Sequence, residues 1–288
     1  MEEGALAGHP RAEAVQAWRQ VVSHPVGGRR QKPRDSGLTM VIDKGIGMRQ
    51  FVDLLEMGGE YIDFIKLGFG TSALYEGARV AEKVDLARDF GVEVYPGGTL
   101  LEVACFQDRL DAFLARSWAM GFRVLEVSDG TIDLAPEERR RIIRQALDAG
   151  FHVLAEVGKK DPVRPMTAEE MVEQIEEDLA SGVGHVIIEA RDSGVGIGIY
   201  DQEGRLKEAM LEAIVQGVSR PERLLWEAPQ VRQQRELILR LGPNVNLGNI
   251  QVPDVVALES MRVGLRSDTF RTVFRTVVAP RKDGTWRP

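Results

Sequence analysis

The sequence alternates short apolar runs with longer helix-like stretches, and this alternation constrains the fold more than any other feature. Most runs are followed by a polar or glycine-rich turn and then by a helical pattern, as at 137–149, 168–180 and 231–241. Nearly continuous apolar runs are typical of parallel strands buried on both faces. We therefore expect repeated strand–helix–strand units around a parallel sheet. The eight candidate strands lie at 38–42, 61–65, 92–95, 124–127, 152–157, 185–188, 224–226 and 245–247.

Eight such units predict a closed (β/α)₈ TIM barrel. The alternative is an open doubly wound sheet, which needs a switch point and usually has fewer uniform repeats. A chain of 288 residues fits a single barrel domain. We expect the barrel at residues 32–279, preceded by an extension at 1–31 that is flexible or partly helical. A loose C-terminal tail is expected at 280–288.

The composition limits the partners. The formal net charge is −7, which argues against a broad nucleic-acid-binding surface. Cys105 is the only cysteine, so the chain forms no internal disulfide and no multi-cysteine metal site. The sequence has neither a signal-peptide pattern nor a long uncharged apolar stretch. We expect a soluble, cytoplasmic protein without a membrane or nucleic-acid partner, and homo-oligomerisation is left open.

Carboxylates gather where the predicted strands end. Glu126, Glu156 and Glu189 each lie two residues beyond an apolar residue that would also point into the barrel. The carboxyl ends of barrel strands form one mouth, where barrel enzymes place their active sites. Converging carboxylates repel one another, and Mg²⁺ is a hard cation that prefers oxygen ligands. These three glutamates are therefore the candidate Mg²⁺ ligands.

A salt-bridge network is the alternative to this metal site. Its cations would be Lys66, Lys159, Lys160 and Arg191, which follow the same strands. No histidine lies near the predicted mouth, which argues against a Ser-His-acid triad and against His-ligated zinc.

Glycine-rich turns follow several predicted strands and give a second, weaker signal. Backbone N–H groups in such turns can approach a phosphate or carboxylate closely. Gly97 and Gly98 are therefore candidate substrate-binding residues, as are the polar residues Ser128 and Asn249 at the ends of other strands. The full dinucleotide-binding fingerprint is missing, so a nicotinamide cofactor is not expected.

These motifs together resemble the phosphosulfolactate synthase family, in order and without large gaps from about Lys32 to Phe270. The sequence carries Asp192 and Ser267 where the family leads us to expect Glu and Gly. The matching segments are Lys32-Pro33-Arg34, Asp43-Lys44-Gly45, Tyr61-Ile62-Asp63, Lys66-x-Gly68-x-Gly70-Thr71-Ser72, Val94-Tyr95-Pro96-Gly97-Gly98-Thr99-Leu100, Ser128-Asp129-Gly130, Glu156-Val157-Gly158-Lys159-Lys160, Glu189-Ala190-Arg191-x-Ser193-Gly194, Glu227-Ala228-Pro229-Gln230 and Gly264-Leu265-Arg266-x-Asp268-Thr269-Phe270.

The resemblance implies a barrel enzyme, a carbon–sulfur lyase, that adds sulfite to phosphoenolpyruvate with Mg²⁺ and forms (R)-2-phospho-3-sulfolactate. In methanogens this reaction opens coenzyme M biosynthesis, and in spore-forming bacteria similar proteins are associated with sulfolactate. The family also includes relatives linked to heat tolerance. A non-catalytic relative and a phosphoenolate lyase that uses another nucleophile therefore remain as alternatives.

This chemistry assigns roles to the cations near the mouth. A lysine would protonate C2 after sulfite attacks C3, and Lys160 and Lys159 are the two candidates. The positive charge of one should lower the pKa of the other, which would bring it towards neutrality. Arg191, Lys44 and Lys66 are candidates for binding the phosphate, carboxylate or sulfite groups.

Overall fold

The structure, a computed structural model, describes Trp18, residues 21–160 and residues 164–277. Its strands form one eight-stranded sheet in the order β3-β2-β1-β8-β7-β6-β5-β4, and every neighbouring pair is parallel. The first and last strands pair directly, so the sheet curls into a nearly closed barrel. The strands are β1 (Thr39–Asp43), β2 (Phe64–Leu67), β3 (Glu93–Pro96), β4 (Val124–Val127), β5 (His152–Val157), β6 (His185–Ile188), β7 (Leu224–Glu227) and β8 (Asn246–Gln251).

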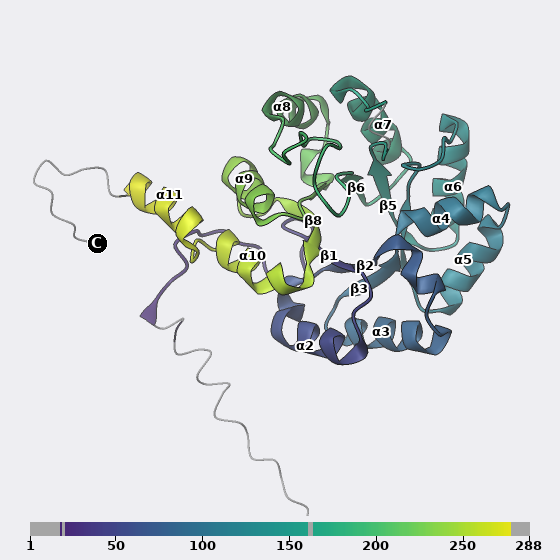
Figure 1. Ribbon diagram of the computed structural model, residues 1–288, viewed down its shortest axis with the longest axis horizontal. Coiled ribbons are helices and arrows are strands. Elements are labelled where there is room, and N and C mark those ends of the chain that lie inside the picture. Colours follow the sequence, from purple (N-terminus) through teal and green to yellow (C-terminus); the bar gives the residue numbers. More distant parts are fainter. Residues whose placement is uncertain (1–17, 19–20, 161–163, 278–288) are drawn as a thin grey trace, which may run out of the picture.

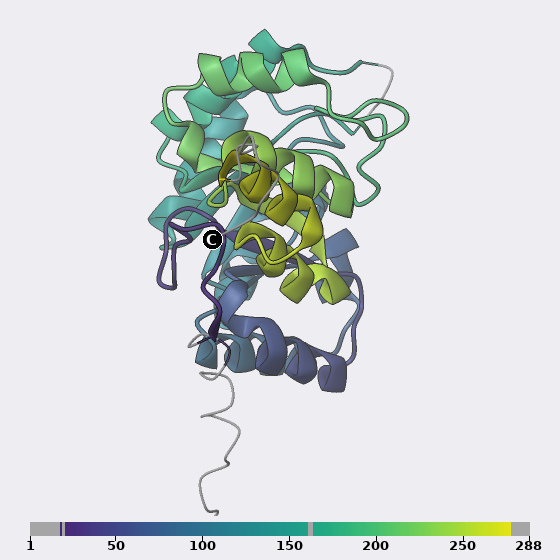
Figure 2. The same ribbon diagram turned by 90° about the vertical axis from the view of Figure 1, so that its left-hand side faces the viewer.

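Helices surround the strands on the outside (Figure 1), which confirms the predicted (β/α)₈ barrel and rules out the open sheet. In the view turned by 90°, the yellow-green C-terminal helices lie between the early blue helices and the late green ones (Figure 2), where they complete the ring. The helices are α2 (Met48–Gly58), α3 (Gly77–Asp89), α4 (Gly98–Phe106), α5 (Leu110–Ala119), α6 (Pro136–Asp148), α7 (Ala168–Ala180), α8 (Glu208–Gly217), α9 (Val231–Leu241), α10 (Val255–Arg262) and α11 (Ser267–Val277).

Two strands differ from the sequence-based prediction by more than one residue at an end. The run at 61–65 is only partly a strand: Tyr61 closes a 3₁₀ turn (Gly59–Tyr61), and β2 begins at Phe64. Asp63 stands between them, where its carboxylate accepts a hydrogen bond from the backbone N–H of Thr39 (2.8 Å) and pairs with Arg34 (2.9 Å). The last strand extends beyond 247 to Gln251, because a glycine and an asparagine interrupt its apolar pattern without ending it.

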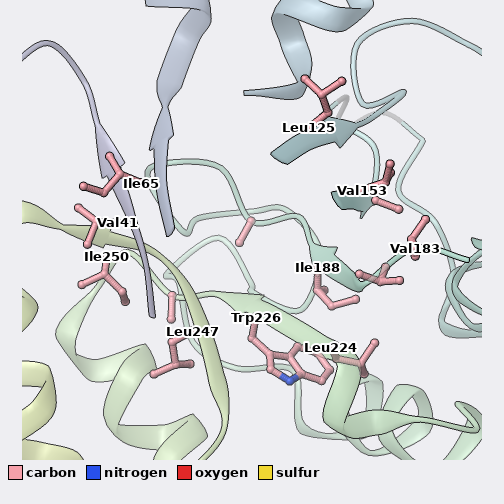
Figure 3. Close-up of a cluster of buried hydrophobic side chains, with 14 of the residues drawn as sticks. Val41, Ile65, Leu125, Val153, Val183, Ile188, Leu224, Trp226, Leu247 and Ile250 are labelled. Carbon is pink, nitrogen blue, oxygen red and sulfur yellow. The ribbon is translucent and has the colours of Figure 1, made fainter. Parts of the chain in front are cut away.

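Both faces of the sheet are buried, which explains the nearly continuous apolar runs. On the outer face, residues such as Val41, Ile65 and Trp226 pack towards the helices (Figure 3). On the inner face, a second cluster fills the barrel. We call it the apolar layer, and it consists of Leu38, Met40, Phe64, Tyr95, Val124, Leu154, Ile187 and Leu225.

The N-terminal extension reaches the barrel before β1. Arg29 lies in the extension predicted to be flexible or partly helical, yet its guanidinium is buried and pairs with Glu259 of α10 at 2.9 Å. Most of the extension and the predicted tail at 280–288 lie outside the described residues. Within the described part of the chain, no helix combines the length and apolar character needed to cross a bilayer.

Candidate active site

A charged layer lies directly above the apolar layer. In β2, β4, β5 and β7, the residue two positions after an apolar-layer residue is charged, and Glu189 follows β6 in the same way. Period-2 alternation of a strand places both residues on the inner face. Each side chain is buried. We call this set the charged layer, and it consists of Lys66, Glu126, Glu156, Glu189 and Glu227.

Lys66 lies among three glutamates of the charged layer. Its Nζ is 3.0 Å from Glu126 Oε2 and 3.1 Å from oxygens of Glu156 and Glu227. Burial alone would lower the pKa of Lys66, but the three carboxylates raise it well above its usual value. Lys66 was predicted to bind substrate, and although it lines the cavity described below, its ammonium group is already engaged by protein carboxylates.

Lys160 bridges the other side of the charged layer. Its Nζ lies 2.7 Å from Glu156 Oε1 and 3.0 Å from Glu189 Oε2. Burial would lower the pKa of Lys160, but these two carboxylates raise it above its usual value. The expectation that a neighbouring positive charge brings this lysine towards neutrality is therefore wrong for the protein without substrate, because two buried acids outweigh that charge.

The acids outnumber the cations, and their pKa values reflect this. Burial raises the pKa of Glu126 to about 7, against the opposing charge of Lys66. Burial also raises the pKa values of Glu189 and Glu227. Burial would do the same to Glu156, but Lys160 and Lys66 hold its pKa well below the usual range. The layer thus carries excess negative charge when its acids are ionised.

Backbone donors fix the orientation of two of these acids. Glu126 Oε1 accepts a hydrogen bond from the N–H of Gly98 (2.8 Å), and its Oε2 accepts one from the hydroxyl of Tyr95 (3.1 Å). Glu227 Oε2 accepts one from the N–H of Ala190 (2.9 Å). The carboxylates are therefore held in place before any ligand arrives.

A cavity of about 340 Å³ opens above the charged layer. Its walls are the carboxyl ends of the strands, the turn Gly68–Ala73 after β2, and the first residues of α4. All five residues of the charged layer line it. From the predicted substrate-binding residues it also includes Lys66, Arg191, Gly97, Gly98 and Asn249.

The two adjacent lysines have different surroundings. Lys160 lines the cavity. Lys159 Nζ instead donates hydrogen bonds to the backbone oxygen (2.8 Å) and Oδ2 (2.9 Å) of Asp129, and it pairs with Asp133 at 3.2 Å. Asp129 is in turn held by Arg139 of α6 at 2.9 Å. Lys159 thus fixes the β4–α6 loop, and the structure places only Lys160 in the cavity wall.

Two other predicted residues lie outside the cavity wall. Ser128 is buried, and its hydroxyl donates a hydrogen bond to Glu102 Oε1 (2.6 Å) on α4. Lys44 Nζ pairs with Asp192 at 3.1 Å, and Asp192 rather than Lys44 lines the cavity. Gly98 shows why a glycine is needed beside Ser128: a Cβ there would lie 2.3 Å from the Ser128 hydroxyl.

The predicted metal ligands lie together at the mouth, with lysines between them. Glu126, Glu156 and Glu189 all line the cavity, and each has an oxygen near the ammonium group of Lys66 or Lys160. Among the described residues, no group of three His, Cys, Asp or Glu residues is arranged to hold a metal ion. The side-chain contacts are those of the salt-bridge alternative, and the roles of the three glutamates in binding Mg²⁺ stay predictions.

Glu227 directly follows the candidate strand at 224–226 but was not among the predicted site residues. It lies two residues after Leu225, the same spacing that identified the other three glutamates, so the signal was available. Tyr95 gave no comparable signal, because its ring belongs to the apolar layer while its hydroxyl reaches Glu126.

The fold and the cavity define the class of protein. A (β/α)₈ barrel with buried acids and lysines at the carboxyl ends of its strands has the architecture of a barrel enzyme. Two solved barrels show the same fold. 3-Keto-L-gulonate-6-phosphate decarboxylase from Vibrio cholerae has a TM-score of 0.53 at 10% identity and covers 82% of this chain and 98% of its own. 3-Hexulose-6-phosphate synthase from Salmonella typhimurium has a TM-score of 0.52 at 13% identity, covering 83% and 99%.

The chain belongs to the phosphosulfolactate synthase family. The family model of (2R)-phospho-3-sulfolactate synthase matches residues 27–268. The phosphosulfolactate synthase of Methanothermobacter thermautotrophicus is 46% identical over 244 residues, covering 84% of this chain and 94% of the relative. That of Methanocaldococcus jannaschii is 45% identical, covering 82% and 95%. That of Bacillus subtilis is 37% identical, covering 84% and 95%. These matches confirm the resemblance inferred from the motifs, and the relatives indicate an enzyme.

Proposed function

We propose that this protein is a phosphosulfolactate synthase, a carbon–sulfur lyase that adds sulfite to phosphoenolpyruvate and forms (R)-2-phospho-3-sulfolactate. The observation that carries the proposal is geometric: Lys160 contacts two buried acids of the charged layer in the wall of a cavity at the barrel mouth, in a chain that belongs to this family. Cytoplasmic location and homo-oligomerisation stay predictions from the sequence.

In the proposed reaction, the sulfur lone pair of sulfite attacks C3 of phosphoenolpyruvate. The C3–S bond forms as the C2–C3 π bond breaks, and its electrons move through C2 into the carboxylate. A proton then adds to C2. No phosphate leaves, so one sulfite, one phosphoenolpyruvate and one proton account for all atoms of the product.

We assign the proton transfer to Lys160. A general acid must be protonated before the reaction, and Glu156 and Glu189 keep Lys160 in that state. Lys159 is the weaker candidate, because its ammonium group contacts Asp129 and Asp133 instead of the cavity.

Arg191 and the N-terminal end of α4 are the proposed anion-binding groups. Arg191 is exposed at the cavity and its guanidinium donates a hydrogen bond to the backbone oxygen of Lys160. Gly97 precedes α4, whose N-terminal N–H groups and helix dipole favour a phosphate or carboxylate. Anions at these positions would add to the excess negative charge of the charged layer, so a further cation is required with the substrates.

Mg²⁺ is the cation proposed for this role. It is usually held by one or two carboxylates together with substrate oxygens and water, so it does not need a cluster of three protein acids. Glu189 Oε2 is buried and accepts no hydrogen bond, although Lys160 Nζ lies 3.0 Å away, so it is the charged-layer oxygen best placed to bind a cation. When bound, Mg²⁺ supplies positive charge for the carboxylate oxygens that receive the electrons.

The direct test is to incubate the full chain with phosphoenolpyruvate, sulfite and Mg²⁺, with and without EDTA, and to follow the product by mass. We expect phosphosulfolactate to form and EDTA to suppress it. Loss of phosphoenolpyruvate without a sulfonated product would show that the enzyme uses a nucleophile other than sulfite. A folded protein that consumes no phosphoenolpyruvate would contradict the proposed activity and support the non-catalytic alternative.

A further inference from the structure

Asn249 lies in a β-bulge at the mouth of the barrel. The register of β8 against β1 shifts here, so that Gly248 and Asn249 together oppose the single residue Met40. Asn249 has a φ of 53°, in the left-handed region that non-glycine residues rarely adopt. Bulges beside active sites can re-aim a side chain, and such strain persists where the surrounding structure enforces it. The local backbone therefore points to a functional role for this side chain.

The amide of Asn249 has one satisfied end and one unsatisfied end. Its Nδ2 donates a hydrogen bond to the backbone oxygen of Arg191 (3.2 Å), which identifies the nitrogen and leaves Oδ1 as the other atom. Oδ1 is buried and has no hydrogen-bond partner. An unsatisfied buried acceptor is destabilising by about 1–3 kcal/mol. Because Asn249 lines the cavity and is only 3% exposed, a ligand in the cavity is the natural partner for this oxygen.

The chemistry of the proposed substrates limits what Oδ1 can contact. Phosphoenolpyruvate and sulfite present mainly acceptor oxygens at neutral pH, and an amide oxygen is itself an acceptor. Contact between them would be repulsive. A divalent cation is the ligand of the proposed reaction that an unpaired oxygen can bind directly.

A carboxylate of the charged layer lies in the same cavity wall: Glu189, whose Oε2 is 3.0 Å from Lys160 Nζ. Glu189 Oε2 accepts no hydrogen bond, and the backbone of Arg191 connects the two side chains: its N–H donates to Glu189 Oε1 and its oxygen accepts from Asn249. Arg191 also has a positive φ, of 60°. Two non-glycine residues in left-handed conformations thus hold the unpaired oxygen of Asn249 and the carboxylate of Glu189 at one cavity.

We propose that Asn249 Oδ1 is a ligand of the divalent cation, which it shares with Glu189. The inference rests on the proposed function for the identity of the substrates. A neutral amide oxygen suits this position, because it binds the cation without adding negative charge to a layer that already has an excess of acids.

The test measures binding of Mn²⁺, a spectroscopic substitute for Mg²⁺, by the loss of its free electron paramagnetic resonance signal. The full chain is titrated with and without phosphoenolpyruvate. Asn249→Gly removes the oxygen and relieves the left-handed strain, so its folded state should be retained. Asn249→Asp keeps an oxygen. Asp108→Gly is the matched control, because Asp108 also has a positive φ (55°) but is exposed and lies in the connection between α4 and α5.

We expect Asn249→Gly to weaken Mn²⁺ binding by roughly 10-fold or more, the scale on which metal sites respond to loss of a supporting group. Asn249→Asp should bind Mn²⁺ at least as tightly as the parent, and Asp108→Gly should match the parent. Unchanged Mn²⁺ affinity in Asn249→Gly, or no Mn²⁺ binding by the parent, would overturn the inference.

The two proposals fail separately. Asn249-dependent Mn²⁺ binding in a protein that does not react sulfite with phosphoenolpyruvate would uphold the metal ligand and contradict the proposed function. Magnesium-dependent product formation, with Asn249→Gly binding Mn²⁺ as tightly as the parent, would do the reverse.

Discussion

The apolar layer and the charged layer come from the same strands, two residues apart, and they affect the stability of the fold in opposite ways. Ile187 is followed by Glu189 and Leu154 by Glu156, on the same inner face. The apolar layer stabilises the barrel by burying hydrocarbon. The charged layer buries acids and ammonium groups. These groups lose their hydration, and the ion pairs that they form compensate for that loss only in part. A folded barrel does not need such a layer, so its presence points to function.

The largest expected effect is a difference in stability between a variant of the charged layer and a variant of the apolar layer. Lys66→Met leaves Glu126, Glu156 and Glu227 without their shared cation, and removing one partner of a buried ion pair is destabilising by about 3–5 kcal/mol. In the apolar layer, Ile187→Val should be destabilising by only about 1 kcal/mol. Urea unfolding at neutral pH measures both.

A second variant sharpens this test. Adding Glu227→Gln to Lys66→Met removes one of the stranded carboxylates and should recover part of the lost stability. Lys66→Met unfolding with the same free energy as the parent would show that the ammonium group does not hold the charged layer together.

The next effect concerns substrate binding at the charged layer. Arg191→Lys keeps the positive charge but loses the planar fork that can bind an oxyanion through two hydrogen bonds. We expect KM for phosphoenolpyruvate to rise by about 10-fold with little change in kcat, corresponding to about 1.4 kcal/mol. Arg140→Lys, at a partly exposed position on α6 outside the cavity wall, is the control. Steady-state kinetics that do not change in Arg191→Lys would remove Arg191 from the anion-binding groups.

The smallest effect tests the other end of the barrel. Burial lowers the pKa of His185, at the start of β6, to about 4 from 6.5. Between these values the unfolded chain binds more protons than the folded one, so stability falls as pH falls through this window. We expect the parent to lose about 1 kcal/mol more than His185→Gln between pH 6 and pH 5. Parallel urea unfolding at both pH values checks this, and equal losses would contradict it.

Much of this arrangement could be predicted from the sequence, because strand periodicity determines which residues share a face. Most of the strand positions and the barrel follow from the repeated apolar runs and helical stretches, and the convergence of Glu126, Glu156 and Glu189 follows from alternation along the strands. The hydrogen-bond partners of individual side chains could not be predicted. Ser128 contacts Glu102 on α4, two helices along the chain from α6. The sequence also gave no means of separating Lys159 from Lys160, since neighbouring side chains diverge according to the local turn.

That divergence supplies the measurement that tests the central claim most directly: product formation by Lys160→Arg compared with Lys159→Arg. Both variants keep the positive charge, so Glu156 and Glu189 retain a counter-charge, but arginine cannot give up a proton. We predict that Lys160→Arg forms phosphosulfolactate at least about 100-fold more slowly than the parent, whereas Lys159→Arg is affected much less. Equal activity of Lys160→Arg and the parent, or a larger loss in Lys159→Arg, would contradict the assignment of proton transfer to Lys160.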